Sequence, residues 1–212
     1  SSQNGRKQYY KEVVKKSLSY LGENSRILEL GSATGDFLDV ASKENIECVG
    51  VEISEYSSKI ASSKGHQVFI GTLEQNFHKI KVSGEFNGVF LHDVFEHLVE
   101  PKNTLELIYE LTARKGIIYF NTLNVDSPTV KYYSKSWSQY APPYHLFYPT
   151  KNSIGSMLSS EGFVMVDQST KGVLYHDLNR NKFGRLLNNR WSRKLTNALG
   201  FGYAQTVIAQ KK

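Results

Sequence analysis

Apolar residues follow two alternating patterns from residue 6 to about residue 120. In one pattern they recur every three or four positions, which is typical of a helix with one buried face. In the other they form short, nearly continuous runs, which are typical of strands buried on both faces. The expected strands cover 26–30, 47–53, 67–70, 86–92 and 116–120, and the expected helices cover 7–21, 35–42, 54–63 and 101–113. Strands that alternate with helices predict a parallel sheet with helices on both faces.

The alternation stops at Asn121. Residues 122–149 contain four of the five prolines and seven aromatic residues. Because a long irregular segment inside a compact domain usually has a function, we expect a lid that binds substrate. A helix, a strand, an amphipathic segment and a last strand should follow, over 150–160, 163–169, 178–199 and 201–210. We therefore treat 1–212 as a single domain with a lid at 122–149 and a basic amphipathic insertion at 171–199.

Length and composition limit the class of protein. The chain has 212 residues, of which 22% are charged, as expected for a folded domain and not for a disordered chain. No apolar run reaches the ~18 residues that a membrane-spanning helix needs, and the first residues lack the apolar core of a secretory signal. The single cysteine, Cys48, cannot form an internal disulfide. These features predict a cytoplasmic location in a reducing compartment.

The net charge of +6 is concentrated near the C-terminus. Eight basic residues and no acidic residue follow Asp177, whereas the first 177 residues carry a net charge of −2. The basic residues of 178–199 alternate with apolar ones at helical spacing, so this segment can contact a membrane surface or an anionic small molecule. It can equally pack its apolar side and expose a solvated basic side. The near-neutral remainder argues against nucleic acid, and we expect no DNA partner.

A strand-to-helix turn carries the first candidate site. Gly31 and Gly35 allow a tight turn and a close approach of the backbone to a ligand. The helix that follows directs free N–H groups and its positive dipole end toward the same place. Glu52 ends the next strand, and a carboxylate there suits the two hydroxyls of a ribose. Together these residues predict a nucleotide-type cofactor.

The same residues carry a resemblance to a known family. ILELGSATGDFL, VGVEIS and FNGVFLHDVFEHLVEP resemble three motifs of the class I S-adenosylmethionine-dependent methyltransferases, and PPYHLFYP resembles a P-x-H-L segment of their small-molecule branch. Ala33 departs from the pattern, since the family commonly has glycine there. The resemblance implies a three-layer α/β, Rossmann-like fold. It also implies a seven-stranded, mostly parallel sheet of order 3-2-1-4-5-7-6, with an antiparallel last strand.

The resemblance also implies a binding role for individual residues. The cofactor would be S-adenosylmethionine, which leaves as S-adenosylhomocysteine. Its methionine end would contact Glu29 and Gly31, and Glu52 would bind its ribose. The other implied contacts are Ser32, Ala33 and Gly35 along the cofactor, Ile53, Thr72 and Leu73 around the adenine, and Leu91 and His92 over the cofactor.

A second cluster combines Asp93, Glu96 and His97 with His145 of the lid. Asp93, Glu96 and His97 would share one face if their segment is helical. His97 or His145 could take a proton from a substrate hydroxyl. Alternatively, all four residues could bind a divalent metal, which is the less favoured hypothesis, or they could only fasten the lid through hydrogen bonds. Of the lid residues, we expect Trp137, Tyr144 and His145 to contact substrate.

These observations predict methyl transfer from S-adenosylmethionine to an oxygen of a small biosynthetic molecule, such as a sugar hydroxyl or a phenol. Two alternatives remain open at this point. One is methylation of RNA or another acceptor, and the other is an inactive, cofactor-binding regulatory module.

Overall fold

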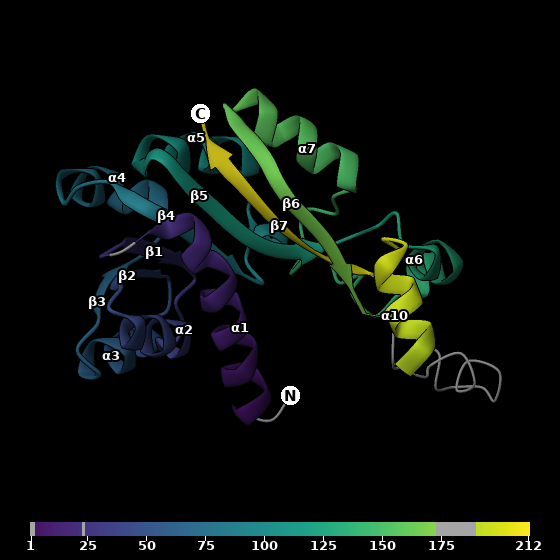
Figure 1. The fold of residues 1–212 in the computed structure, drawn as a ribbon, viewed down its shortest axis with the longest axis horizontal. Helices are drawn as coiled ribbons and strands as arrows, with labels where there is room; N and C mark the ends of the chain where they lie inside the picture. The colour runs from purple at the N-terminus through teal and green to yellow at the C-terminus, as the bar shows by residue number, and fades with distance from the viewer. Residues whose placement is uncertain (1–2, 23, 173–189) are drawn as a thin grey trace.

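The computed structural model describes residues 3–22, 24–172 and 190–212. Its centre is one seven-stranded sheet of order β3-β2-β1-β4-β5-β7-β6, drawn in Figure 1. The strands are β1 Arg26–Leu30, β2 Glu47–Glu52, β3 Gln67–Ile70, β4 Phe86–His92, β5 Thr112–Leu123, β6 Phe163–Lys171 and β7 Ala204–Lys211. β7 runs antiparallel to both neighbours, whereas β1 to β5 pair in parallel. The predicted fold class and strand order are confirmed.

Most helices connect consecutive strands. They are α1 Gln3–Leu21, α2 Asp36–Ala41, α3 Glu55–Ser63, α4 Leu73–Val82, α5 Pro101–Leu111, α6 Pro128–Tyr133, α7 Lys151–Ser160 and α10 Arg190–Ala198, with short 3₁₀ turns η1 Ser42–Glu44, η2 Phe95–His97 and η3 Ser134–Ser136. The sequence pattern missed α4. Thr72 caps that helix by accepting a hydrogen bond from the backbone of Gln75, whose side chain accepts one in return.

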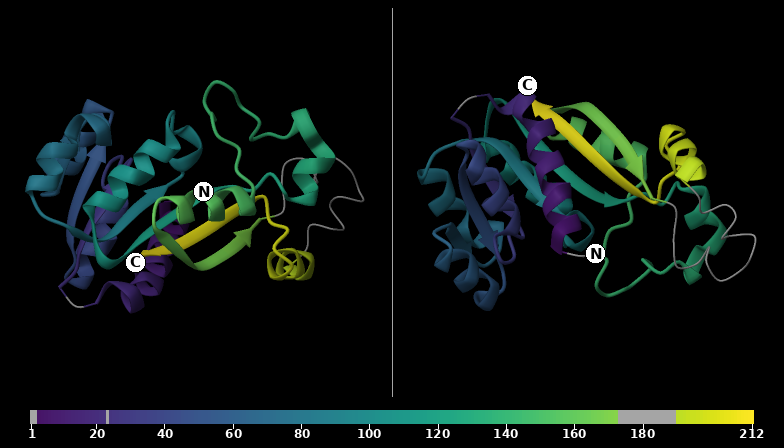
Figure 2. Two further views of the ribbon diagram at one scale, coloured as in Figure 1. Left: turned by 90° about the horizontal axis from the view of Figure 1, so that it is seen from above. Right: turned by 60° about the horizontal axis from the view of Figure 1, so that its bottom comes forward.

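Alternate residues of each central strand face two separate cores. On β5, Ile118 and Phe120 belong to the core formed with α4, α5 and α7. Ile117 and Tyr119 belong to the core formed with α1 and α2. Figure 1 and the right view of Figure 2 show α1, in purple, lying across this second face. Two covered faces explain why the strands read as continuous apolar runs.

The lid and the C-terminal region differ in part from the prediction. Residues 122–149 are not irregular throughout, because they include α6 and η3. In the predicted insertion at 171–199, residues 173–189 lie outside the described part of the chain. Its remainder forms α10, which packs near β6. The side chain of Leu195 on α10 is exposed, as are those of Leu199 and Phe201 just beyond it. Membrane contact through 178–199 stays a prediction.

Across the three described ranges, no helix combines the length and apolar character that a membrane crossing requires.

Candidate functional site

The turn between β1 and α2 requires glycine at two positions. Gly31 (φ +71°) and Gly35 (φ +80°) adopt the left-handed backbone region. A Cβ at Gly31 would lie 2.5 Å from Val94 Cγ2, and one at Gly35 would lie 3.1 Å from the Cβ of Ala61. Ala33 occupies the same region (φ +45°), which costs about 1–2 kcal/mol for a residue other than glycine. The alanine therefore keeps the backbone shape of the turn at a small energetic cost.

Glu52, at the end of β2, is held by two backbone donors. The N–H of Ala33 donates to Oε2 at 2.8 Å, and the N–H of Ser54 donates to Oε1 at 2.7 Å. Each carboxylate oxygen keeps a further lone pair. The turn therefore presents an oriented acceptor for a pair of hydroxyls, as the ribose assignment requires.

Glu29, on β1, has an unfilled hydrogen-bonding position. Its side chain is 3% exposed, Oε1 lies 3.1 Å from His92 Nδ1, and Oε2 has no partner among the described residues. Burial raises the pKa of Glu29 well above its usual value, because the charged form loses its hydration. Burial also lowers the pKa of His92 to about 4, so this ring is neutral at pH 7. Glu29 is therefore suited to a cationic ligand, which would stabilise its charged form.

Two adjoining cavities open at this end of the strands. One, of about 190 Å³, is lined by Arg6, Tyr10, Glu29, Gly31, Ser32, Ala33, Asp36, Phe37, His92 and Asp93. The other, of about 260 Å³, is lined by Gly5, Arg6, Tyr9, Tyr10, His92 and Asp93. We call them the inner cavity and the outer cavity. Both lie beneath α1, and they share four lining residues.

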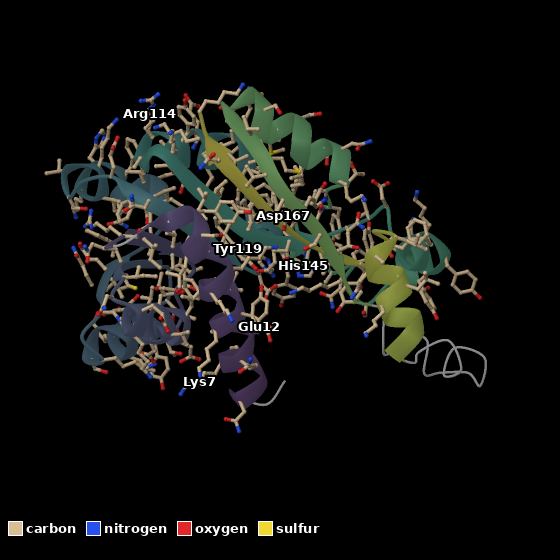
Figure 3. All side chains as sticks on the ribbon, viewed as in Figure 1. Lys7, Glu12, Arg114, Tyr119, His145 and Asp167 are labelled. Carbon is tan, nitrogen blue, oxygen red and sulfur yellow. The ribbon has the colours of Figure 1, made fainter. Side chains whose placement is uncertain are left out.

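The sequence analysis missed the residues of α1 that line these cavities. Arg6, Tyr9 and Tyr10 belong to no recognisable motif. Their only signal was helical spacing, because Tyr10 lies three and four positions before the buried Val13 and Val14. By contrast Lys7 and Glu12, labelled in Figure 3, extend from α1 into solvent. Arg6 adds a cation to the lining of both cavities, and the lining of the inner one also includes Glu29 and Asp36.

The other predicted cofactor residues divide into three groups, apart from Thr72, which is the exposed N-cap of α4. Ser32 and Ala33 line the inner cavity. Ile53 is 74% exposed just beyond β2, where an adenine could cover it. Leu73 and Leu91 are buried in the core on the opposite face of the sheet, so their side chains do not line either cavity.

The second predicted cluster brings together residues that lie far apart in the sequence. The rings of His97 and His145 are 4.9 Å apart, and potential ligand atoms of Glu96, His97 and His145 lie within 4.8 Å of one another. Backbone N–H groups of Leu146 and Phe147 donate to the carbonyl of Glu96 at 2.8 and 3.0 Å. These bonds fasten the lid, in which Figure 3 labels His145, to η2.

Both histidines in this cluster are oriented by backbone carbonyls. His97 Nδ1 lies 2.6 Å from the carbonyl oxygen of Tyr144, and His145 Nδ1 lies 2.7 Å from that of Gln139. Because a carbonyl only accepts, each Nδ1 carries the proton, and Nε2 of a neutral ring keeps its lone pair. Glu96 is 4% exposed, and its Oε2 has no partner within the described ranges. Burial raises the pKa of Glu96.

Asp93 does not share a helical face with Glu96 and His97, because the chain is not helical at Asp93 and the condition for a shared face is not met. The 3₁₀ turn begins only at Phe95, and Asp93 has a left-handed backbone (φ +53°). The side-chain amide of Asn121, on β5, donates to Asp93 Oδ1. Asp93 consequently faces the two cavities beneath α1.

The lid aromatics predicted to contact substrate occupy different environments. Trp137 is 2% exposed and packs with Leu123 and Val130 in a third apolar cluster. Tyr144 is 77% exposed. Trp137 is therefore placed as a packing residue of the lid, whereas Tyr144 is accessible to a ligand.

Comparison with known proteins identifies the family and the fold of this chain. A model described as "methyltransferase domain" matches residues 3–168. A protein of Geobacillus sp. (strain WCH70), which is named as a methyltransferase, is 30% identical to this chain over 120 residues. These residues are 53% of this chain and 49% of that protein. The chain thus spans about half the length of the curated relative that it matches.

Two solved structures show the same fold over nearly the whole chain. A SAM-dependent methyltransferase from Archaeoglobus fulgidus aligns with a TM-score of 0.69 and 22% identity, covering 97% of this chain and 94% of the other. Magnesium protoporphyrin IX methyltransferase from Synechocystis PCC 6803, with bound SAH, aligns with a TM-score of 0.66 and 14% identity, covering 98% and 84%.

Proposed function

Since the chain belongs to the methyltransferase-domain family and has the fold of a solved SAM-dependent methyltransferase, we propose that the whole protein uses S-adenosylmethionine to methylate a hydroxyl oxygen of a small molecule. The observation that carries the oxygen assignment is the pair of histidines, His97 and His145, whose Nε2 atoms are kept available as proton acceptors. A hydroxyl needs such an acceptor because it must lose its proton when its oxygen is methylated.

The residues of the first turn fit the cofactor. Glu29, with its partnerless Oε2, would bind the methionine ammonium, and Arg6 in the lining of the same cavity complements the carboxylate. Glu52 would bind the ribose hydroxyls. When bound, the cofactor supplies an electrophilic methyl carbon, to which the acceptor oxygen bonds while the electron pair of the broken carbon–sulfur bond stays on sulfur.

The chain itself contributes proton transfer and exclusion of water. A neutral His97 or His145 takes the hydroxyl proton at Nε2, and the Nδ1–H bond to a backbone carbonyl fixes the ring while it does so. The lid is packed around Trp137 and is fastened to η2 beside the two histidines. Water is kept from the reacting oxygen, which must be held about 3–3.5 Å from its target carbon.

The test is turnover on a panel of sugar hydroxyls, phenols and amines, followed by release of S-adenosylhomocysteine. We expect product with a methoxy group from at least one hydroxyl acceptor, and we expect His97→Ala and His145→Ala to lose turnover without losing cofactor binding. Methylation confined to amines would refute the oxygen assignment. Unchanged turnover in both variants would refute the role of the histidines.

A metal-assisted reaction is the second candidate, favoured by the convergence of Glu96, His97 and His145. Two imidazoles and one carboxylate form a donor set that suits first-row ions such as Zn²⁺, Mn²⁺ or Fe²⁺. Bonds of about 2.1 Å place two ligands of one ion at most about 4.2 Å apart. The ligand atoms here lie within 4.8 Å of one another, so no more than small side-chain rotations bring them to this geometry.

Calorimetric titration with Zn²⁺ and Mn²⁺, with turnover measured after exhaustive chelation, separates the two candidates. Full activity in the chelated protein eliminates the metal. Two results together would favour the metal-assisted mechanism over the metal-free base. Chelation would abolish an activity that one of the ions restores, and Glu96→Gln would no longer bind that ion. His78→Ala, an exposed histidine on α4, is the matched control.

A further inference from the structure

The outer cavity has no role in cofactor binding as described above. It lies between the first turns of α1 and the end of β4, and shares Arg6, Tyr10, His92 and Asp93 with the inner cavity. Building on the proposed function, we propose that the outer cavity holds the ring of the acceptor and that Asp93 binds a hydroxyl group other than the one whose proton His97 or His145 takes. The chemistry of the pocket points to a single ring that carries at least two hydroxyl groups.

Asp93 is held in an unusual conformation that aims it at this place. Its backbone is left-handed (φ +53°), which a non-glycine residue seldom adopts and which often marks a functional position. Asn121 donates to Oδ1 and fixes the carboxylate from the neighbouring strand. The other oxygen, Oδ2, remains able to accept a hydrogen bond from a ligand.

The position of Asp93 relative to the glycine turn brings it close to the reacting centre. Val94, the next residue, contacts the turn, because a Cβ on Gly31 would lie 2.5 Å from Val94 Cγ2. Gly31 lines the inner cavity together with Glu29, where the methionine end would bind. A ligand in the outer cavity therefore lies directly beside the part of the cofactor that carries the methyl group.

His92, which lines the same cavity, has a second acceptor atom buried next to it. Its side chain is 4% exposed, and Nε2 has no partner within the described chain. If Nδ1–H donates to Glu29, the neutral ring leaves a lone pair on Nε2. A buried acceptor without a donor is costly, so a ligand hydroxyl that fills it is stabilised. Asp93 thus provides an exposed place for a hydroxyl donor, and the buried Nε2 of His92 provides a second one once its ring rotates toward the cavity.

The walls and the volume of the outer cavity suit a ring-shaped ligand. The rings of Tyr9 and Tyr10, with centroids 5.7 Å apart, form an aromatic wall against which a flat or pyranose ring can pack. A cavity of about 150 Å³ holds benzene. The outer cavity, at about 260 Å³, therefore has room for one substituted ring.

The experiment measures binding of two probes to the complex with S-adenosylhomocysteine. Catechol and methyl β-D-glucoside are titrated calorimetrically, since both carry neighbouring hydroxyls, and the pair distinguishes a phenolic from a sugar acceptor. We expect at least one probe to bind, and Asp93→Asn to weaken it by roughly tenfold or more, as loss of a charge-assisted hydrogen bond predicts. Because Asp93 also lines the inner cavity, the affinity for S-adenosylhomocysteine is measured in parallel, and the loss of probe affinity should clearly exceed any change in it.

Two further variants and a stability measurement test whether a loss of probe binding is specific to the pocket. Asn adopts the left-handed backbone as readily as Asp, so Asp93→Asn should keep its melting temperature. Tyr9→Ala, which removes part of the aromatic wall, should also lower the affinity for the probe. Glu106→Gln on α5 removes an exposed carboxylate far from the cavities and should change nothing.

A crystal structure of the ternary complex decides between the remaining outcomes. A probe beside Asp93 and Tyr9 supports the proposal. The proposal is overturned if neither probe binds, if the probe lies only beside His97 and His145, or if the methionine end of the cofactor fills the outer cavity. Failure of S-adenosylhomocysteine itself to bind is a different result, because it would overturn the proposed function.

Discussion

The cofactor side and the lid side of the site are assembled in different ways. On the cofactor side, Glu29, Gly31, Ala33 and Glu52 come from two adjacent strands and the turn that follows the first, and backbone N–H groups orient Glu52 directly. On the lid side, His97 is oriented by the carbonyl of Tyr144, which lies 47 positions later in the chain. The first arrangement depends on the sheet itself, whereas the second depends on how the lid folds back over it.

Removing an imidazole from the lid side should produce the largest effect on catalysis. We expect His97→Ala or His145→Ala to lower kcat by about 10²–10⁴-fold, which is the usual contribution of a general base. Binding of S-adenosylhomocysteine should stay unchanged, because neither histidine lines the inner cavity. Steady-state kinetics and calorimetry measure the two quantities. A parallel loss of cofactor affinity would show that the two sides are not separable.

The next effect concerns the stability of the lid. Trp137→Ala should empty the centre of the third apolar cluster. We expect it to reduce either the free energy of global unfolding or the free energy of local opening of the lid by about 3–5 kcal/mol. Urea unfolding measures the first case, and hydrogen exchange of residues 123–148 measures the second. Tyr132→Ala, at an 80% exposed position, should cost no more than about 0.5 kcal/mol. Equal effects of the two variants would contradict the packing role of Trp137.

On the cofactor side, Glu52→Ala should weaken binding of S-adenosylhomocysteine by about 10–100-fold. The variant removes the acceptor for the ribose hydroxyls and leaves the N–H groups of Ala33 and Ser54 without their partner. Glu55→Ala, an exposed carboxylate three positions later, should bind normally. Since the lid is not touched, its hydrogen exchange should match that of the parent protein.

The smallest effect, and the most diagnostic for Glu29, is a change in pH dependence. An acid whose pKa is raised in the folded state contributes stability below its unfolded pKa, and this contribution is lost as pH rises toward the folded pKa. Glu29→Gln should therefore stabilise the cofactor-free protein at pH 7–8, and this advantage should disappear near pH 4. Thermal unfolding across this range tests the sign.

The same variant should bind S-adenosylhomocysteine more weakly, because the amide cannot pair with the methionine ammonium as a carboxylate does. A variant that is more stable and yet binds less would identify Glu29 as a group retained for function. A pH-independent difference in stability would contradict the burial argument.

The sequence determined the elements that depend on local chemistry. Runs of apolar residues predicted β1, β3 and β4 with their observed bounds, because strands covered on both faces have no polar alternative. The glycines of the first turn were identifiable because their left-handed backbone excludes most other residues. Glu52 could be found from its position at the end of a strand. Helix α4 was missed although a capping box marks its start and Leu73, Phe77 and Ile80 recur at helical spacing.

Only the tertiary structure decided how distant segments meet. It brought α1 over the strand ends, separated Asp93 from Glu96 and His97, and buried Trp137 inside the lid. None of these arrangements follows from spacing along the chain. They depend on hydrogen bonds and apolar contacts between residues tens of positions apart, such as Asn121 with Asp93 and Tyr144 with His97. Local sequence patterns contain no record of such contacts, because each partner is compatible with many other environments until the sheet has formed.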